Sequence, residues 1–151
     1  MPLSNLNIAK YRFTLQAKDK ITLPAYKGSA FHGGFGHALK QISPTWFNYF
    51  YQPGAGKQGD WPKPFVILPP LDDKESYQPG EQFHCELTLF GEATQHYSIC
   101  QAAIEYLGMQ MGLGYDLGKF QVTNITESRP ISTTAITTKQ IQLQLPTRLR
   151  L

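Results

Sequence analysis

The chain has 151 residues and a mass of 17.0 kDa, which suits one globular domain and is short for two of ordinary size. Hydrophobic residues make up 41% of it and charged residues 17%, so the composition excludes an intrinsically disordered chain, a coiled coil and a highly charged tail. Two cysteines, Cys85 and Cys100, are too few for a disulfide framework or a zinc site. No apolar run is long enough to cross a membrane, and residues 1–5 lack the basic and apolar regions of a secretory signal. We therefore expect a cytoplasmic protein without a membrane partner.

The net charge of +3 is distributed unevenly along the chain. Residues 1–63 carry eight Lys or Arg and two acids, which is +6, and residues 64–127 carry two Lys and nine acids, which is −7. Residues 128–151 carry four basic residues and no acid, which is +4. This pattern fits a polyanion bound on one side of the protein, and it also fits ordinary variation on the surface of a small protein.

The first third of the chain predicts a strand followed by a helix. Residues 11–17 alternate apolar and polar side chains, which is the period of a half-buried strand, and Asp19 and Lys20 follow as a turn. Residues 21–24 continue extended because Pro24 disfavours helix before it. A helical period then predicts a helix that ends at Ser43 and Pro44, and its core stripe consists of Phe31, Phe35, Ala38, Leu39 and Ile42.

Three glycines, Gly33, Gly34 and Gly36, lie in the early turns of this predicted helix. Each costs about 1 kcal/mol relative to Ala in a helix interior. Close approach of a neighbouring part of the chain would offset that cost, and so would a phosphate at the positive end of the helix. Of the two explanations, the sequence favours packing.

The remaining elements are predicted by short apolar runs and by turn residues. Residues 44–63 are rich in aromatic side chains and predict one short helical turn and then a loop, and residues 64–69 predict a short strand. Residues 82–89 alternate cleanly as a further strand, and extended structure resumes at residues 119–122. A long helix lies between these two strands and stops at Gly112–Gly114, with a core stripe predicted from Ile99, Ala103, Tyr106, Leu107 and Gln110, and with Ala102 beside it.

The order strand, helix, strand, strand, helix, strand predicts an α+β fold of the ferredoxin-like type, βαββαβ, over residues 1–128. In this fold an antiparallel sheet carries two helices on one face. Residues 129–138 are rich in Ser, Thr and Pro and predict a linker. Residues 139–151 contain one more alternating segment, which either pairs with the sheet edge or begins a second domain.

The strongest candidate for chemistry is the helix over residues 31–42. His37 and Lys40 are i, i+3 neighbours on the side away from the apolar stripe, and Tyr26, Lys27 and His32 lie just before them. A histidine moves protons near neutral pH, a lysine stabilises charge on a phosphoryl group, and a tyrosine orients or donates. These are the groups that metal-free RNA cleavage by a ribose 2′-hydroxyl needs. The alternative is an ordinary solvated helix face.

Other candidate groups are weaker. His32 and His37 are five residues apart, about 140° round a helix, which does not suit a shared metal ion, so we expect no metal or cofactor. His84 lies on the polar side of its strand and His96 lies near the start of the second helix. Both are interpreted as surface residues or, for His96, as a helix cap.

Five segments of the chain resemble, in order, the CRISPR precursor-RNA processing endoribonucleases of the RAMP superfamily. The first segment is Leu23–Lys40, with its Tyr-Lys-Gly-Ser-Ala-Phe-His-Gly-Gly-Phe-Gly-His run. The others are residues 64–70, 77–81, 87–91 and 112–120. The resemblance implies two tandem ferredoxin-like domains that cut CRISPR repeat RNA without metal, leave a 2′,3′-cyclic phosphate and pass the guide to an interference complex. DNA is not an expected partner.

The resemblance also implies site residues and a place in the whole protein. It implies that His37 is the general acid or base, with His32 as the reserve and with Lys40 and Tyr26 as helpers; for RNA binding we select Lys27, Lys40, Arg12 and Arg148. Residues 141–151 are similar to the first strand of the second domain, so we expect the N-terminal half of such an enzyme, inactive or weakly RNA-binding alone. This chain departs from the family pattern because residues 46–61 lack cysteine and the Gly-rich C-terminal loop is absent. A non-catalytic RAMP subunit and a ferredoxin-like protein-interaction module stay open as alternatives.

Overall fold

The computed structural model describes residues 7–54 and 62–128. The predicted linker over residues 129–138 and the predicted strand over residues 139–151 therefore lie outside the described residues. In chain order the elements are β1 (Ile8–Ala17), β2 (Ile21–Thr22), α1 (Lys27–Ile42), α2 (Pro44–Tyr51), β3 (Phe65–Leu68), β4 (Ser76–Tyr77), β5 (Gln82–Phe90), the 3₁₀ helix η2 (Gly91–His96), α3 (Tyr97–Tyr106), the π-helical η3 (Leu107–Met111) and β6 (Phe120–Ser128).

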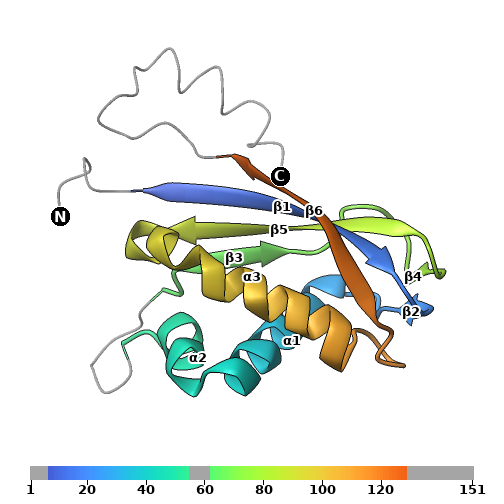
Figure 1. Cartoon of the computed structure of the whole chain (residues 1–151), viewed down its shortest axis with the longest axis horizontal. Coiled ribbons are helices and arrows are strands. Elements are labelled where there is room, and N and C mark those ends of the chain that lie inside the picture. The colour runs from blue at the N-terminus through green and yellow to red at the C-terminus, as the bar shows by residue number, and fades with distance from the viewer. Residues whose placement is uncertain (1–6, 55–61, 129–151) are drawn as a thin grey trace, which may run out of the picture.

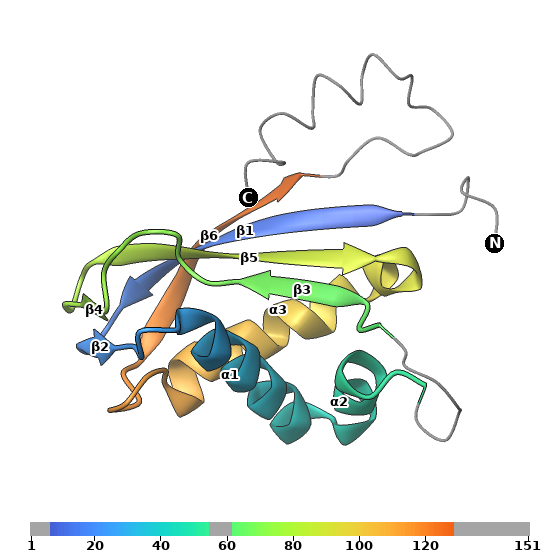
Figure 2. The ribbon, with the colours of Figure 1, turned by 180° about the vertical axis from the view of Figure 1, so that it is seen from behind.

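Four strands form one antiparallel sheet in the order β3-β5-β1-β6. Helix α1 connects β1 to β3 and helix α3 connects β5 to β6, so the main elements follow the βαββαβ plan. Both views of the ribbon show the helices on one side of the sheet (Figures 1 and 2). The predicted ferredoxin-like fold is confirmed. Strands β2 and β4 form a small second sheet of two strands.

The sheet has one apolar face and one polar face because its strands alternate with period 2. Alternate residues of β1 and β5 point into the core between the sheet and the helices, and their neighbours point to the other face, which we call the open face. Register places Arg12 opposite Glu86 and Thr14 opposite His84 on the open face. The buried residues of the two strands are Ala9, Tyr11, Phe13, Leu15, Ala17, Phe83, Cys85, Leu87 and Leu89.

Helix α1 covers the sheet with four of the five predicted core residues: Phe31, Phe35, Ala38 and Leu39 are all at most 1% exposed. The prediction was wrong for Ile42, which is 36% exposed at the last position of the helix. The chain turns directly into α2 there, and Phe50 of that helix fills the core instead.

Two of the three helix glycines are explained by packing. A Cβ on Gly34 would lie 3.1 Å from a methyl group of Leu107, and a Cβ on Gly36 would lie 2.8 Å from the ring of Tyr51. Close approach therefore accounts for both residues, as the sequence favours. A Cβ on Gly33 would meet nothing within 4 Å.

Helix α2 is longer than the single predicted turn. It has eight residues because Ser43 caps it: the Ser43 Oγ accepts a hydrogen bond from the backbone N–H of Trp46 at 3.3 Å, and Pro44 occupies the first helical position. Its aromatic side chains pack toward β3 and η2.

The predicted core stripe of α3 was partly wrong. Ala103 and Leu107 are buried as predicted, but Cys100 and Ile104 complete the stripe, while Ile99 is half-buried and Gln110 is exposed. Two apolar stripes with helical spacing run along this segment, and packing on the sheet selects the one that contains Cys100. None of the described helices is both long and apolar enough to span a membrane.

Candidate nucleic-acid interface

His37 and Lys40 lie together on the solvent side of α1. Both are exposed and one helical turn apart, as their i, i+3 spacing predicts. The Lys40 Nζ atom lies 5.4 Å from the centroid of the Phe47 ring, which is within reach of a cation–π contact to α2. The structure thus brings these two predicted site residues together, with an imidazole and an ammonium group both open to a ligand.

Tyr26 lies at the opposite end of α1. It occupies the N-cap position, is 76% exposed, and its ring lies against Gly28. Eleven residues separate Tyr26 from His37, which corresponds to about 16 Å along a helix axis. The two side chains therefore do not converge on one phosphate from this helix.

Lys27 is tied to the segment that follows β3. Its Nζ donates hydrogen bonds to the backbone carbonyl of Asp72 at 2.8 Å, to Asp72 Oδ1 at 2.9 Å and to the backbone carbonyl of Lys74 at 3.0 Å. The Lys27 side chain is only 10% exposed. Three acceptors match the three donors of an ammonium group, so Lys27 anchors this segment to the start of α1.

The carboxylate of Asp72 accepts further hydrogen bonds besides the one from Lys27. The Tyr77 hydroxyl lies 3.0 Å from both carboxylate oxygens of Asp72, and the backbone N–H of Lys74 donates to Oδ1. Burial acts to raise the pKa of Asp72, but the hydrogen bonds from Lys27, Lys74 and Tyr77 outweigh it and hold that pKa below its ordinary value. The carboxylate is therefore ionised and fixed in place.

His32 lies among aromatic side chains and apart from His37. Its ring stacks on Phe65, with centroids 5.7 Å apart and planes at 8°, and lies 4.9 Å from the ring of Tyr51. The Tyr51 hydroxyl donates to the His32 carbonyl at 2.6 Å. Burial, and then the positive charge of Lys63, lower the pKa of His32. This histidine is neutral at neutral pH and packs as an aromatic ring.

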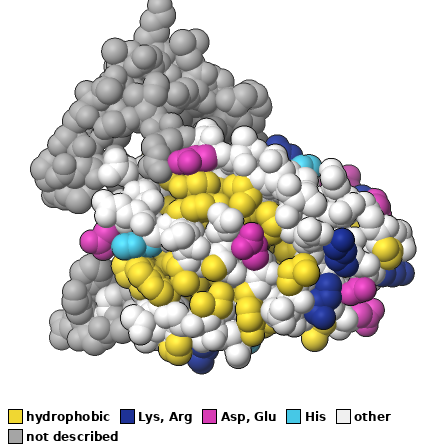
Figure 3. Space-filling view, in the orientation of Figure 1, with side chains coloured by type: hydrophobic (Ala, Val, Ile, Leu, Met, Phe, Trp, Pro, Cys, Tyr) yellow, Lys and Arg dark blue, Asp and Glu magenta, His cyan; other side chains and the backbone are white. Residues whose placement is uncertain are grey.

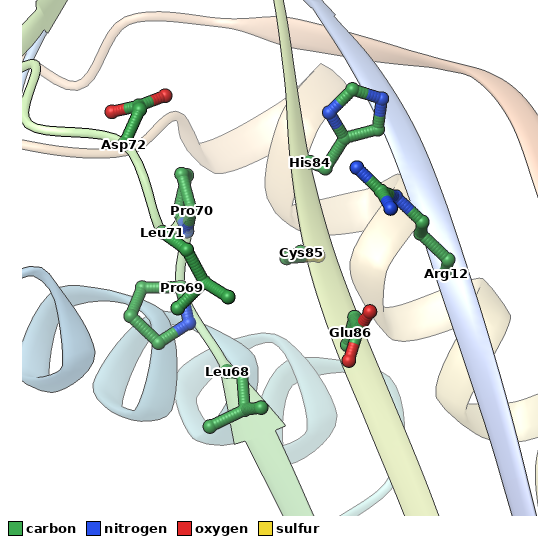
Figure 4. Close-up of a pocket in the computed structure, with 9 residues that line it drawn as sticks. All are labelled: Arg12, Leu68, Pro69, Pro70, Leu71, Asp72, His84, Cys85 and Glu86. Carbon is green, nitrogen blue, oxygen red and sulfur yellow. The ribbon is translucent and has the colours of Figure 1, made fainter. Parts of the chain in front are cut away.

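A pocket of about 220 Å³ opens on the open face of the sheet, and we call it the sheet-face pocket. Arg12 of β1 and His84 of β5 form one side with Glu86, and the segment after β3 forms the other side (Figure 4). In the close-up, the His84 ring and the Arg12 guanidinium lie next to each other across the two strands. The lining residues are Arg12, Leu68, Pro69, Pro70, Leu71, Asp72, His84, Cys85 and Glu86.

The charges around this pocket are mixed. Glu86 Oε1 lies 3.3 Å from Lys10 Nζ on the neighbouring strand. Burial and then the positive charge of Arg12 lower the pKa of His84, and Asp72 acts in the opposite direction. The Arg12 side chain is exposed and makes no hydrogen bond or ion pair with any of the described residues. Its guanidinium donors are therefore open to a ligand.

His84 is the member of this pocket that sequence reasoning interpreted as a plain surface residue. Arg12 was selected for RNA binding, and Arg148, selected with it, lies outside the described residues. Alternation along β1 and β5 places both Arg12 and His84 on the polar side of a strand, but only the register between the strands makes them neighbours.

Within residues 7–54 and 62–128, no cluster of three or more His, Cys, Asp or Glu could hold a metal ion.

The opposite side of the molecule has a different character. The space-filling view of the α3 side shows hydrophobic side chains over much of the surface, with Lys and Arg mostly toward the end where β2 and β4 lie (Figure 3). A polyanion would meet few cations over α3. The cations and donors discussed above lie on the open face and along α1 instead.

Comparison with known proteins places the chain in a family. A family model named AF_1859_N and described as an N-terminal domain matches residues 6–148. None of the curated proteins matches the sequence. One similar solved structure is a Csm3–Csm4 subcomplex of the type III-A CRISPR–Cas interference complex, with a TM-score of 0.61 and 13% identity over 82% of this chain and 79% of that one.

A second similar structure is a Cas6 product complex, with a TM-score of 0.52 and 17% identity over 78% of this chain. That match takes in 40% of the Cas6 chain, so the present chain spans less than half of the Cas6 length. At such identities the likeness concerns the fold. The chain belongs to the AF_1859_N family of N-terminal domains, and its ferredoxin-like fold is similar to that of the Csm3–Csm4 subcomplex.

Proposed function

We propose that this chain is the RNA-binding N-terminal domain of a CRISPR RAMP protein. The observation that carries the proposal is the match of its βαββαβ fold to the Csm3–Csm4 subcomplex over most of both chains. The five ordered segments that resemble RAMP endoribonucleases support it independently. The polar open face supplies the chemistry, because it presents Arg12 next to His84, and Lys10 lies two residues from Arg12 along β1.

Single-stranded RNA suits such a surface. Arg and Lys neutralise phosphates and release counterions, and this term supplies most sequence-independent affinity. Sequence-specific recognition of RNA mostly uses unstacked bases whose edges accept and donate hydrogen bonds. The uncommitted donors of Arg12 and the mixed donors and acceptors near His84 serve both purposes.

The finer proposal is that the full-length protein cleaves CRISPR repeat RNA. The 2′-hydroxyl oxygen would attack the adjacent phosphorus, lose its proton to a base, and form a 2′,3′-cyclic phosphate. The bond to the 5′-oxygen would break, and that oxygen would take a proton from an acid. His37 is the described histidine best exposed for one of these transfers, and Lys40, one turn away, would stabilise charge on the phosphoryl oxygens. The aromatic packing of His32 favours His37 over it for this role.

A non-catalytic RNA-binding subunit is the second candidate. It is favoured by the larger share of the Csm3–Csm4 chain that the match covers, 79% against 40% for Cas6, and by the higher TM-score. Both candidates require RNA binding, and only the first requires cleavage. Incubating the full-length protein with repeat RNA separates them, because cleavage products with a cyclic phosphate form only in the first case.

The experiment that tests the common proposal is a salt series. The full-length protein should bind CRISPR repeat RNA with a log affinity that falls linearly as log salt concentration rises. Binding that is absent, or that does not depend on salt, would contradict RNA binding and would favour a protein-interaction module.

A further inference from the structure

We infer that the sheet-face pocket receives one unstacked guanine base of the bound RNA strand. The inference rests on the proposed RNA binding and adds a specific base contact to it. Neither the family match nor the similar structures assign a ligand to these residues.

The size of the pocket points to a single ring system. Its volume of about 220 Å³ lies below the roughly 300–1,000 Å³ of pockets that hold drug-sized ligands. A whole nucleotide would extend out of it, so the sugar and phosphate would remain on the open face of the sheet. Lys10 lies on that face, two residues along β1 from Arg12, which lines the pocket.

One wall of the pocket is built in advance. The segment with Pro69, Pro70 and Leu71 is held against α1 by the three hydrogen bonds of Lys27 to Asp72 and Lys74. The two proline rings limit backbone freedom further. A preformed apolar wall lowers the entropic cost of binding the flat face of a base.

The polar side of the pocket selects among possible ligands. Glu86 and Asp72 carry negative charge into it, which opposes a bare phosphate, and Arg12 carries positive charge, which opposes a metal ion. A neutral ring with both donors and acceptors on its edges is repelled neither by the carboxylates nor by the guanidinium. Nucleobases are ligands of this class.

Among the bases, guanine matches the donors and acceptors best. An arginine guanidinium donates two parallel hydrogen bonds to the O6 and N7 acceptors of guanine. The amino and imino N–H groups on its other edge need an acceptor, and the Glu86 carboxylate, whose Oε1 also faces Lys10, is one. His84 lies next to the Arg12 guanidinium in the same wall of the pocket (Figure 4). Arg12 has no partner among the described residues that would compete.

The test uses the full-length protein and short single-stranded RNAs. One strand is all uridine, and a second carries one guanosine at its centre. Wild type should bind the guanosine strand at least about fivefold more tightly, which is the low end of the discrimination that one bidentate pair supplies. Arg12→Gln and His84→Gln should each reduce that ratio toward one. Lys18→Gln, a matched loss of one exposed positive charge away from the pocket, should lower both affinities by the same factor and keep the ratio.

Three results would overturn the inference while leaving RNA binding intact. Wild type would bind both strands equally; or Arg12→Gln would weaken both strands by one common factor, as expected of a phosphate contact; or both pocket variants would leave both affinities unchanged. Loss of all salt-dependent RNA binding in wild type would instead overturn the proposed function. Thermal unfolding of each variant checks that the variant is folded. If Arg12→Gln is not folded, the comparison of the two strands is made with His84→Gln alone.

Discussion

Lys27 and Asp72 lie 45 positions apart in the sequence, yet the Nζ of one is 2.9 Å from the Oδ1 of the other. The contact joins the first turn of α1 to the segment that forms the apolar wall of the sheet-face pocket. Lys27 was selected from the sequence as an RNA-binding residue, and that role stays a prediction. Its three hydrogen bonds give it a structural role in addition.

Replacing this ammonium group tests the structural role. Lys27→Met keeps most of the side chain but removes the donor to the carbonyls of Asp72 and Lys74, and it leaves the Asp72 carboxylate with only the Lys74 N–H and the Tyr77 hydroxyl. Hydrogen bonds of charged groups contribute about 1.5–3 kcal/mol net, so the free energy of unfolding should fall by about that amount. Lys18→Met, at an exposed position beyond β1, should stay within about 0.5 kcal/mol of wild type. Urea unfolding measures both, and equal values for the two variants would contradict the anchoring role.

The two glycines Gly33 and Gly36 form a matched pair within α1. Gly33→Ala gains helix propensity of up to about 1 kcal/mol because its Cβ enters open space. Gly36→Ala should lower the free energy of unfolding by about 1 kcal/mol or more, because its Cβ would lie 2.8 Å from the Tyr51 ring, whose hydroxyl is held by the His32 carbonyl. Thermal and urea unfolding of the two variants show whether each substitution raises or lowers the free energy of unfolding. If both substitutions stabilise the protein, the close contact of Gly36 is not the reason for the glycine.

His32 makes stability depend on pH in a defined direction. Burial, followed by the charge of Lys63, lowers the pKa of His32 below the ordinary 6.5, so the unfolded chain binds a proton more readily than the folded one. The stabilising effect of a neutral His32 is complete above pH 6.5 and is lost as the pH falls from 6.5 toward the lowered pKa of the folded state. His32→Phe retains a ring against Phe65 and removes the titration.

Urea unfolding at a series of pH values between 8 and 5 checks this effect. The loss of stability below the ordinary histidine pKa should be smaller in His32→Phe than in wild type. Part of the loss should remain, because the pKa of His84 is lowered as well. Parallel profiles for the variant and wild type would show that the environment of His32 does not disfavour its protonated form.

The cleavage proposal is tested by removing the exposed histidine. His37→Ala in the full-length protein should slow single-turnover cleavage of repeat RNA by about a hundredfold, the scale of a lost general acid or base. RNA affinity should change little by comparison. His96→Ala, which removes the last residue of η2, a histidine that contacts Trp46 and Tyr49 of α2, is the matched control. Undiminished cleavage in both His37→Ala and His32→Ala would rule out both histidines as the acid or base.

Much of the fold was predictable because its signals are local. The alternation of residues 82–89, the end of α1 at Ser43 and Pro44, and the end of the second helical segment at Gly112 each depend on neighbours within a few positions. The order of these elements then indicates the βαββαβ plan. The exposed pairing of His37 with Lys40 was predictable for the same reason, because both lie on one helix.

The parts that differ depend on contacts between distant segments. Residues 97–111 carry two apolar stripes of equal spacing, and only packing against the sheet buries Cys100 and Ile104 in preference to Ile99. Strand register, which brings His84 beside Arg12, results from hydrogen bonds between β1 and β5. The sheet-face pocket also needs the segment of residues 68–72, held there by Lys27 from another element. Local sequence thus determined which side chains of β1 and β5 face outward, and tertiary packing decided which stripe of the second helical segment is buried and which outward side chains meet, because register and long-range anchoring leave no local pattern.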